Sequence, residues 1–358
     1  MASFDGATNF AKLIDPKVFL NWIYRADSQT NRFIQSGVLQ NNPTIAAALL
    51  QPGRVAEIPA VNPLSGTPNE WNDSNDITTG NVTSDTEANI KMYENKAFGA
   101  TDWGKLVSGA DALQQIASQF GHFWSNWETQ LVLATVQSAF LNTDIATAKT
   151  YGVGTEKDLA ATDFVKSLAR MGDVASNTLS SVVVNSAAYS EMREQNLIEY
   201  IQPSTGGNPI AAYQGMAIIQ DDSIPVAADG TTYALIFGPN AISFATATPE
   251  NGIVTARDEF KSGGVAAIIQ KRVTSLHVNG TTIDLGKTSA DSYRADLLAG
   301  TKPLFKVAGD PRNIQIVKYG FKVASDYVVP TINTKAAAAS GTGSSTGTTS
   351  GTGTSTGK

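Results

Sequence analysis

The chain has 358 residues, no cysteine, two histidines and a formal net charge of −6. The lack of cysteine excludes disulfides, cysteine-ligated zinc, iron–sulfur clusters and thiol nucleophiles. The negative charge argues against a protein built mainly to grip nucleic acid, because phosphate attraction requires clustered lysine and arginine. Only 16% of the residues are charged, below the usual quarter. Such a surface is typical of a protein that buries much of its exterior against copies of itself, although a monomer rich in Ser, Thr, Asn and Gly also has one.

The N-terminal segment predicts an arm. A helix is expected to begin at Asp15, with apolar residues at helical spacing through Trp22, and to end near Gly37. Residues 36–52 offer little from which to build a compact domain. We therefore interpret residues 1–52 as an N-terminal arm and not as part of a core. The start of the chain has no signal-like segment, and no apolar run approaches the ~20 residues of a membrane helix, so we expect a soluble protein made in a cytoplasm.

A protruding hairpin is predicted next, over residues 53–104. Its strands are Arg54–Val61 and Ile90–Phe98, and the long stretch between them is polar, with five acidic residues and no lysine or arginine. The acidic residues are Glu70, Asp73, Asp76, Asp85 and Glu87. An isolated hairpin is marginally stable in water, so this one needs a surface to lie on, and a neighbouring subunit is one candidate.

The clearest element is a long helix expected from Ser108 to about Leu141, within residues 105–150. Apolar residues recur every three or four positions from Leu113 to Ala134 and form a continuous stripe. The helix should be a rod about 45 Å long. An ordinary long core helix is sufficient to explain this pattern.

Residues 151–334 mix helices and strands without strict alternation, which favours an α+β fold over a doubly wound sheet. We expect a helix over Thr162–Met171, a strand over Ser181–Asn185 and then a helix capped by Ser186, with Tyr189, Met192 and Ile198 facing inward. Further strands are expected over residues 215–220, 232–238, 242–246, 265–278 and 313–323. Residues 335–358 are almost entirely Gly, Ser and Thr after a short alanine run, which predicts a flexible tail.

No catalytic constellation is visible. His122 and His277 lack neighbouring metal ligands in sequence, so both are read as structural or surface histidines. The chain has no GxSxG or GxGxxG motif, its terminal GTGTSTGK cannot be followed by the helix that a phosphate loop needs, and Asp221–Asp222 lies in an expected turn. We expect no enzyme activity, no metal and no cofactor. A hydrolase that uses two carboxylates would need a pocket that the sequence alone cannot reveal.

Several ordered motifs resemble one family. The segment GRVAEIPAVNPLSG, then NKAFGATDWGKLVSGADALQQIASQFGHFWSNWETQLVLATVQSAF, and later VVVNSAAYSEMREQNLIEYI together resemble the major capsid proteins of tailed bacteriophages. The resemblance covers roughly residues 10 to 325. It implies the Hong Kong 97-type fold, with an N-arm through Pro52, an extended loop over residues 53–100, a spine helix in the peripheral domain, and an axial domain within residues 151–334.

The resemblance also implies a function. Copies of the chain would form hexamers and pentamers that close an icosahedral head around double-stranded DNA, assembled in the host bacterial cytoplasm and retained in the virion. Expected partners are a separate scaffold protein, a portal and a decoration protein, with only weak non-specific contact to DNA and none to membranes. Two alternatives stay open: an encapsulin-like nanocompartment shell and a stalked surface-binding protein.

Between subunits, the acidic loop would meet basic residues of a neighbour, with the N-arm contributing to the same contacts. The acidic candidates are Glu70, Asp73 and Asp76. The remaining contact candidates are Trp22, Arg25, Arg32, Lys91 and Lys96.

Overall fold

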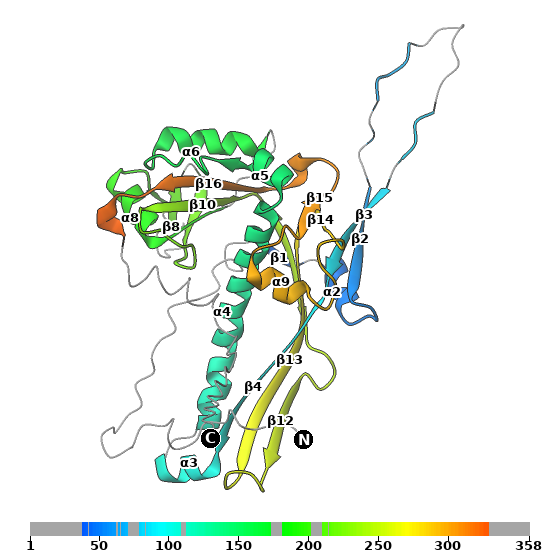
Figure 1. Cartoon of the computed structure of the whole chain (residues 1–358), viewed down its shortest axis with the longest axis vertical. Coiled ribbons are helices and arrows are strands. Elements are labelled where there is room, and N and C mark those ends of the chain that lie inside the picture. Colours follow the sequence, from blue (N-terminus) through cyan, green and yellow to red (C-terminus); the bar gives the residue numbers. More distant parts are fainter. Residues whose placement is uncertain are drawn as a thin grey trace, which may run out of the picture.

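The computed structural model describes residues 38–41, 43–61, 64, 66–70, 79–82, 84–108, 112–172, 181–201, 210–213 and 215–328. The helix expected to begin at Asp15 and the tail over residues 335–358 lie outside these ranges. In the described part, a long helix runs beside a long narrow sheet, a second sheet with its helices lies at one end, and a hairpin projects away from the body (Figure 1). The mixture of helices and sheets without strict alternation confirms the α+β prediction.

The long narrow sheet is organised around the 14-residue strand β13 (Val265–Val278). Strand β4 (Met92–Thr101) runs antiparallel along one side of it. On its other side lie β12 (Ile253–Asp258) and then β11 (Ile242–Ala247), both antiparallel. The strands of this sheet present many buried apolar side chains, and helix α4 packs against β13 and β4.

Helix α4 (Ala112–Phe140) is the predicted long helix. Its apolar stripe is buried at Phe120, Leu131, Val132 and Val136, so the periodicity identified both the helix and its inward face. A separate short helix, α3 (Asp102–Ser108), precedes it. The expected start at Ser108 is therefore wrong, because Ser108 ends α3.

The second sheet has seven strands in the order β5-β16-β10-β6-β9-β8-β7. Their bounds are Thr150–Tyr151, Ile316–Lys322, Thr231–Phe237, Ser181–Val184, Met216–Gln220, Ile210–Tyr213 and Glu199–Ile201. Helices α6 (Ala161–Leu168) and α8 (Ser186–Glu194) complete this part of the molecule. Its core includes the fully buried Val182, Ile236 and Phe321, so the predicted strands over 181–185, 215–220, 232–238 and 313–323 are confirmed with small shifts at their ends.

Two local predictions in α8 need correction. The cap is Asn185, whose side-chain oxygen accepts a hydrogen bond from the Ala188 amide at 2.8 Å, and not Ser186, which is the first helical residue. The helix ends at Glu194, so Ile198 follows it and is only partly buried in the second core. Ser and Asn are both good caps, and the sequence placed them side by side, which explains the shift by one residue.

The hairpin consists of β2 (Val55–Val61) and β3 (Ser84–Ile90), paired antiparallel from Val55↔Ile90 to Val61↔Ser84. The predicted second strand, Ile90–Phe98, therefore has a different partner: β4 leaves the hairpin and pairs with β13. Strands β3 and β4 are consecutive, separated by Lys91 alone. The local pattern correctly indicated extended backbone, but it could not reveal that the chain changes partners at one residue.

Residues 38–49 belong to the core, contrary to the expectation of an arm through residue 52. Strand β1 (Leu39–Asn41) pairs in parallel with β11, and helix α2 (Pro43–Leu49) packs on the same strand. Val38 is fully buried, and Ile45 and Leu49 are each only 1% exposed. Ile45 and Leu49 are four residues apart and so share one helix face, which is enough to attach a short alanine-rich helix to a sheet.

The remaining elements are short. Helices α5 (Thr143–Lys149) and α9 (Tyr293–Ala299) contact α4, and the two-stranded sheet of β14 (Thr281–Ile283) and β15 (Phe305–Val307) contacts α4 and the first sheet. In the described part of the chain, 3-10 turns lie at Ala169–Met171, Pro311–Asn313 and Ser325–Tyr327. Over the described residues, no helix is both long enough and apolar enough to cross a bilayer.

Candidate functional site

The projecting hairpin is the first candidate surface. Val61, Leu64 and Val82 lie along it and are 72%, 79% and 67% exposed. Figure 1 shows the paired strands and the described residues beyond them extending clear of the body. A two-stranded ribbon that carries exposed apolar side chains gains little stability by itself. Its geometry therefore suits a surface that is covered by another molecule.

The base of the hairpin is tied to the body by polar side chains. The Asn89 amide donates to the Ser275 hydroxyl at 2.6 Å, and the Ala88 backbone amide donates to the Thr282 hydroxyl at 2.9 Å. His277, which is completely buried, lies with Nε2 2.6 Å from Glu87 Oε2. These contacts join β3 to β13 and β14, so the direction in which the hairpin leaves the body is fixed at its root.

Lys91 stands where the chain passes from β3 to β4. It is 3% exposed, and its ammonium donates to the Gln51 carbonyl at 2.9 Å. Burial lowers the pKa of this ammonium below its usual range. The expectation that Lys91 meets the acidic loop of a neighbour is corrected by this geometry, because the charged group is enclosed within its own chain.

The other predicted contact residues divide into two groups. Lys96 is exposed on β4, where its ammonium lies 5.3 Å from the centroid of the Phe98 ring, and Glu70 is exposed in the distal part of the hairpin. Trp22, Arg25, Arg32, Asp73 and Asp76 lie outside the described residues. Among the described residues, the acidic candidate Glu70 forms no ion pair with Lys91 or Lys96.

Helix α4 is fixed to the sheet by a buried charged cluster that sequence reasoning missed. Arg272 on β13 donates to Glu94 at 3.1 Å and to Glu128 at 2.6 Å, so one guanidinium joins β13, β4 and α4. Trp124 and Trp127 of α4 donate their indole N–H groups to Gln270 and Glu94. The only sequence signal was the pair of tryptophans on the helix, since the charged partners lie far apart in the chain.

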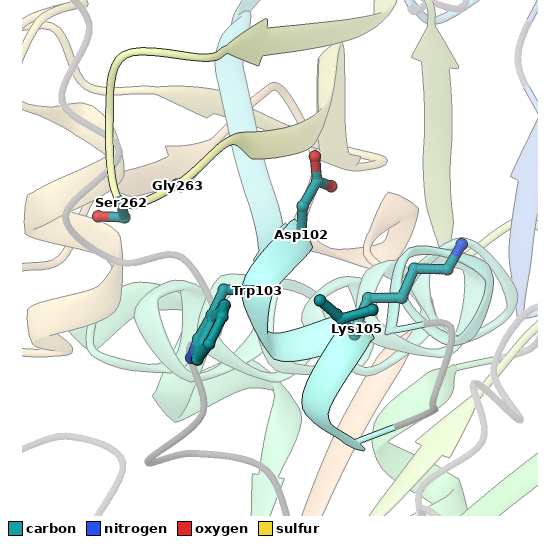
Figure 2. Close-up of a pocket in the computed structure, with 6 residues that line it drawn as sticks. Asp102, Trp103, Lys105, Ser262 and Gly263 are labelled. Atoms are coloured by element: carbon teal, nitrogen blue, oxygen red, sulfur yellow. The ribbon is translucent and has the colours of Figure 1, made fainter.

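A pocket of about 670 Å³ lies at the far end of the long sheet from the second sheet. It is lined by Asp102, Trp103, Lys105 and Leu106 of α3 and by Ser262 and Gly263 of the β12–β13 loop. Figure 2 shows Trp103 and Lys105 extending from α3 on opposite sides, beside the loop that carries Ser262 and Gly263. Its lining contains no histidine and one acidic side chain, Asp102, so Ser262 and Lys105 have neither a histidine nor a pair of carboxylates beside them in the pocket.

The groups that could have suggested catalysis lie apart from one another. His122 is exposed on α4 and His277 is buried against Glu87. Asp221 accepts the Ser223 amide and Asp222 accepts the Ser186 amide, which are turn and helix-start contacts. Among the residues described, no three His, Cys, Asp or Glu side chains come together as metal ligands.

Comparison with known proteins bears on the function of the chain. No protein-family model matches it. The major capsid protein of Bacillus phage SPP1 is 25% identical over 328 residues, which span 87% of this chain and 97% of that protein. The chain is a bacteriophage major capsid protein.

Solved structures agree in fold. The capsid of Ralstonia phage GP4 matches this capsid protein with a TM-score of 0.54 at 13% identity, over 87% of this chain and 96% of the other. The capsid asymmetric unit of Cyanophage Pam1 matches with a TM-score of 0.54 at 11% identity, over 91% and 100%. The expected Hong Kong 97-type capsid fold is therefore confirmed, and neither the nanocompartment nor the surface-binding alternative gains support from these matches.

Proposed function

We propose that copies of this capsid protein assemble into hexamers and pentamers that close an icosahedral head around double-stranded DNA, without catalysing a reaction. The observation that carries the proposal is the hairpin, whose apolar side chains have no cover within the described chain. Burying them on a neighbour gains roughly 25 cal/mol per Å² of apolar area. The fold shared with capsid assemblies supports the same reading.

Within this proposal, each segment of the chain corresponds to one part of the capsid fold. The β2–β3 hairpin is the extended loop, and α4 is the spine of a peripheral domain built on the long sheet. The seven-stranded sheet with α6 and α8 is the axial domain. Trp22, Arg25, Arg32 and Lys96 are proposed to meet a neighbour that carries Glu70, Asp73 and Asp76.

The proposed partners other than the chain itself are a scaffold protein, a portal and a decoration protein. Contact with the packaged DNA is weak and non-specific. The net charge of −6 supports that part of the proposal, because a strong phosphate-binding surface requires an excess of positive charge.

The experiment is to express the chain with and without its scaffold protein and to examine the product by size-exclusion chromatography and negative-stain electron microscopy. Closed shells, or rings of five and six copies, are the expected result. A stable monomer under every condition, scaffold included, would overturn the proposal.

A matched pair of variants tests the hairpin. Val61→Ser, Leu64→Ser and Val82→Ser together should prevent assembly while leaving the unfolding temperature of the monomer unchanged, because these side chains are exposed in the single chain. The control changes Leu141, Val165 and Leu285, exposed at 44%, 47% and 52% elsewhere on the molecule, to Ser in the same way. The control should assemble like the unmodified protein.

A further inference from the structure

The tip of the long sheet carries exposed aromatic and aliphatic side chains that the hairpin contact does not use. Phe260, in the loop between β12 and β13, is 103% exposed, so its ring contacts nothing in its own chain. Trp103 and Leu106 of the adjacent α3 are 60% and 78% exposed. Large apolar side chains gathered at one exposed place mark an interaction site.

The loop that presents Phe260 is held in one shape. The Asp258 carboxylate accepts the Phe260 amide at 3.0 Å, and the Gly264 carbonyl accepts the Asp102 amide at 2.9 Å. Gly264 has φ +92°, and a Cβ on it would lie 2.8 Å from the Asp102 carboxylate, so only glycine fits there. A loop ordered in this way before contact loses little conformational entropy on binding.

The same tip also offers a cavity. The pocket of about 670 Å³ has Trp103 and Leu106 as its apolar side chains, and Gly263 opens its loop side. Pockets of about 300 to 1,000 Å³ accept small organic groups, so an aromatic ring fits this one. Phe260 is not among the residues that line it, so the projecting ring and the pocket are separate features of the same tip.

Charge favours a second copy as the occupant. Residues 102–108 and 257–264 carry three acidic and three basic side chains, although the whole chain has a net charge of −6. Arg257 pairs with both Asp102 and Glu259. Two such tips therefore approach without the net repulsion that other parts of this acidic protein would produce.

We propose that tips of neighbouring copies meet head to tail, with Phe260 of one copy inserted into the pocket between Trp103 and Leu106 of the next. This inference rests on the proposed function, because it supplies a contact between copies of an assembling shell. A contact that joins two different patches is heterologous, so successive copies close into a ring where the rotation permits. The tip contact is separate from the hairpin contact.

Because the chain has no cysteine, a disulfide can form only between cysteines that are introduced on purpose, and this allows a cross-linking test. Two versions of the chain, one with Phe260→Cys and one with Leu106→Cys and a different tag, are coexpressed with the scaffold, and the assembled particles are oxidised. The expected product is a disulfide-linked pair that contains one copy of each version. In the control, Phe260→Cys is combined with Leu285→Cys, whose side chain is also half-exposed but lies after β14, and no mixed pair should form.

Other outcomes overturn the inference without affecting the proposed function. Intact particles with no mixed pair, or with pairs of Phe260→Cys alone, would show that Phe260 does not enter this pocket. Failure of the cysteine-free chain to form particles would instead count against the proposed function. A second measurement uses Phe260→Ala, which should lower particle yield about tenfold or more, as for a buried aromatic anchor. Equal yield from Phe260→Ala and the unmodified chain would overturn the inference.

Discussion

The guanidinium carbon of Arg272 lies 3.9 Å from the centroid of the Trp124 ring. The arginine belongs to the central strand of the long sheet and the tryptophan to the helix that crosses it. The same guanidinium pairs with Glu94 and Glu128. Helix and sheet are thus joined by a stacked cation with two carboxylates at a site that is 9% exposed, in addition to the apolar stripe.

Removing the Arg272 guanidinium should lower the free energy of unfolding more than removing an exposed guanidinium does. Arg272→Ala removes the guanidinium that the two buried carboxylates share, and breaking a buried ion pair in this way costs about 3–5 kcal/mol. Chemical denaturation of the unassembled protein, monitored by tryptophan fluorescence, measures the loss. Arg257→Ala, which removes an exposed arginine, is the control and should cost less than about 1 kcal/mol. Similar losses for the two variants would contradict the prediction.

The hairpin root gives a second prediction. Glu87→Ala removes the partner of His277 Nε2, and the Nδ1 of this buried histidine has no hydrogen-bond partner among the described residues. We expect amide hydrogen exchange in residues 84–90 to become faster, because β3 loses one of its links to β13. Glu57→Ala, at an exposed position on β2 of the same hairpin, should leave that exchange unchanged. Unaltered protection in Glu87→Ala would show that the histidine does not hold the hairpin.

The unfolding free energy at alkaline pH should depend on the buried Tyr319. Burial raises its pKa to about 12 from the ordinary 10.0. Because the folded pKa is raised, the stabilisation is fully present below pH 10 and is lost as the pH rises through 12. Unfolding free energies of the unmodified chain and Tyr319→Phe at pH 8 and pH 11 are compared. The loss between these values should be smaller in the variant by about 1 kcal/mol. Equal losses would contradict the assignment.

Charge reversal tests the proposed acidic contacts. Asp73→Lys together with Asp76→Lys should stop shell formation, and adding Lys96→Glu should restore part of it if that lysine is a partner. Glu250→Lys with Asp326→Lys makes the same change in net charge at exposed positions on the body and should assemble normally. Normal shells from the Asp73 and Asp76 variant would remove the acidic loop from the interface.

Local patterns predicted most of the regular structure. The helical stripe from Leu113 to Ala134 identified α4 because side chains three and four residues apart must share a face. Val182 and its neighbours gave a buried strand because an apolar β-branched run between polar residues suits a sheet interior. The fold itself came from the order of motifs that resemble capsid proteins.

What the sequence could not give was the pairing between distant segments. The pattern around Ile90 and Met92 predicts a single strand. The chain nevertheless changes its pairing partner at Lys91, because β13 pairs with β4 and not with the strands of the hairpin. The core role of Ile45 and Leu49 was missed because a seven-residue helix is too short to stand out. Arg272 lies 178 residues from Glu94 and 144 from Glu128 in the sequence, so no spacing rule could have brought them together.

The consecutive strands β3 and β4 have a mechanical consequence. A single extended segment runs from the hairpin, through Lys91, along β13 and into α3 at the tip. Extended backbone, which rises about 3.3 Å per residue, cannot be stretched much further. The ten residues of β4 therefore form a stiff segment about 33 Å long. A force applied to the hairpin by a neighbour therefore reaches β13 and β14 first through the contacts of Glu87, Ala88 and Asn89, and then continues along β4 toward the opposite tip of the same subunit.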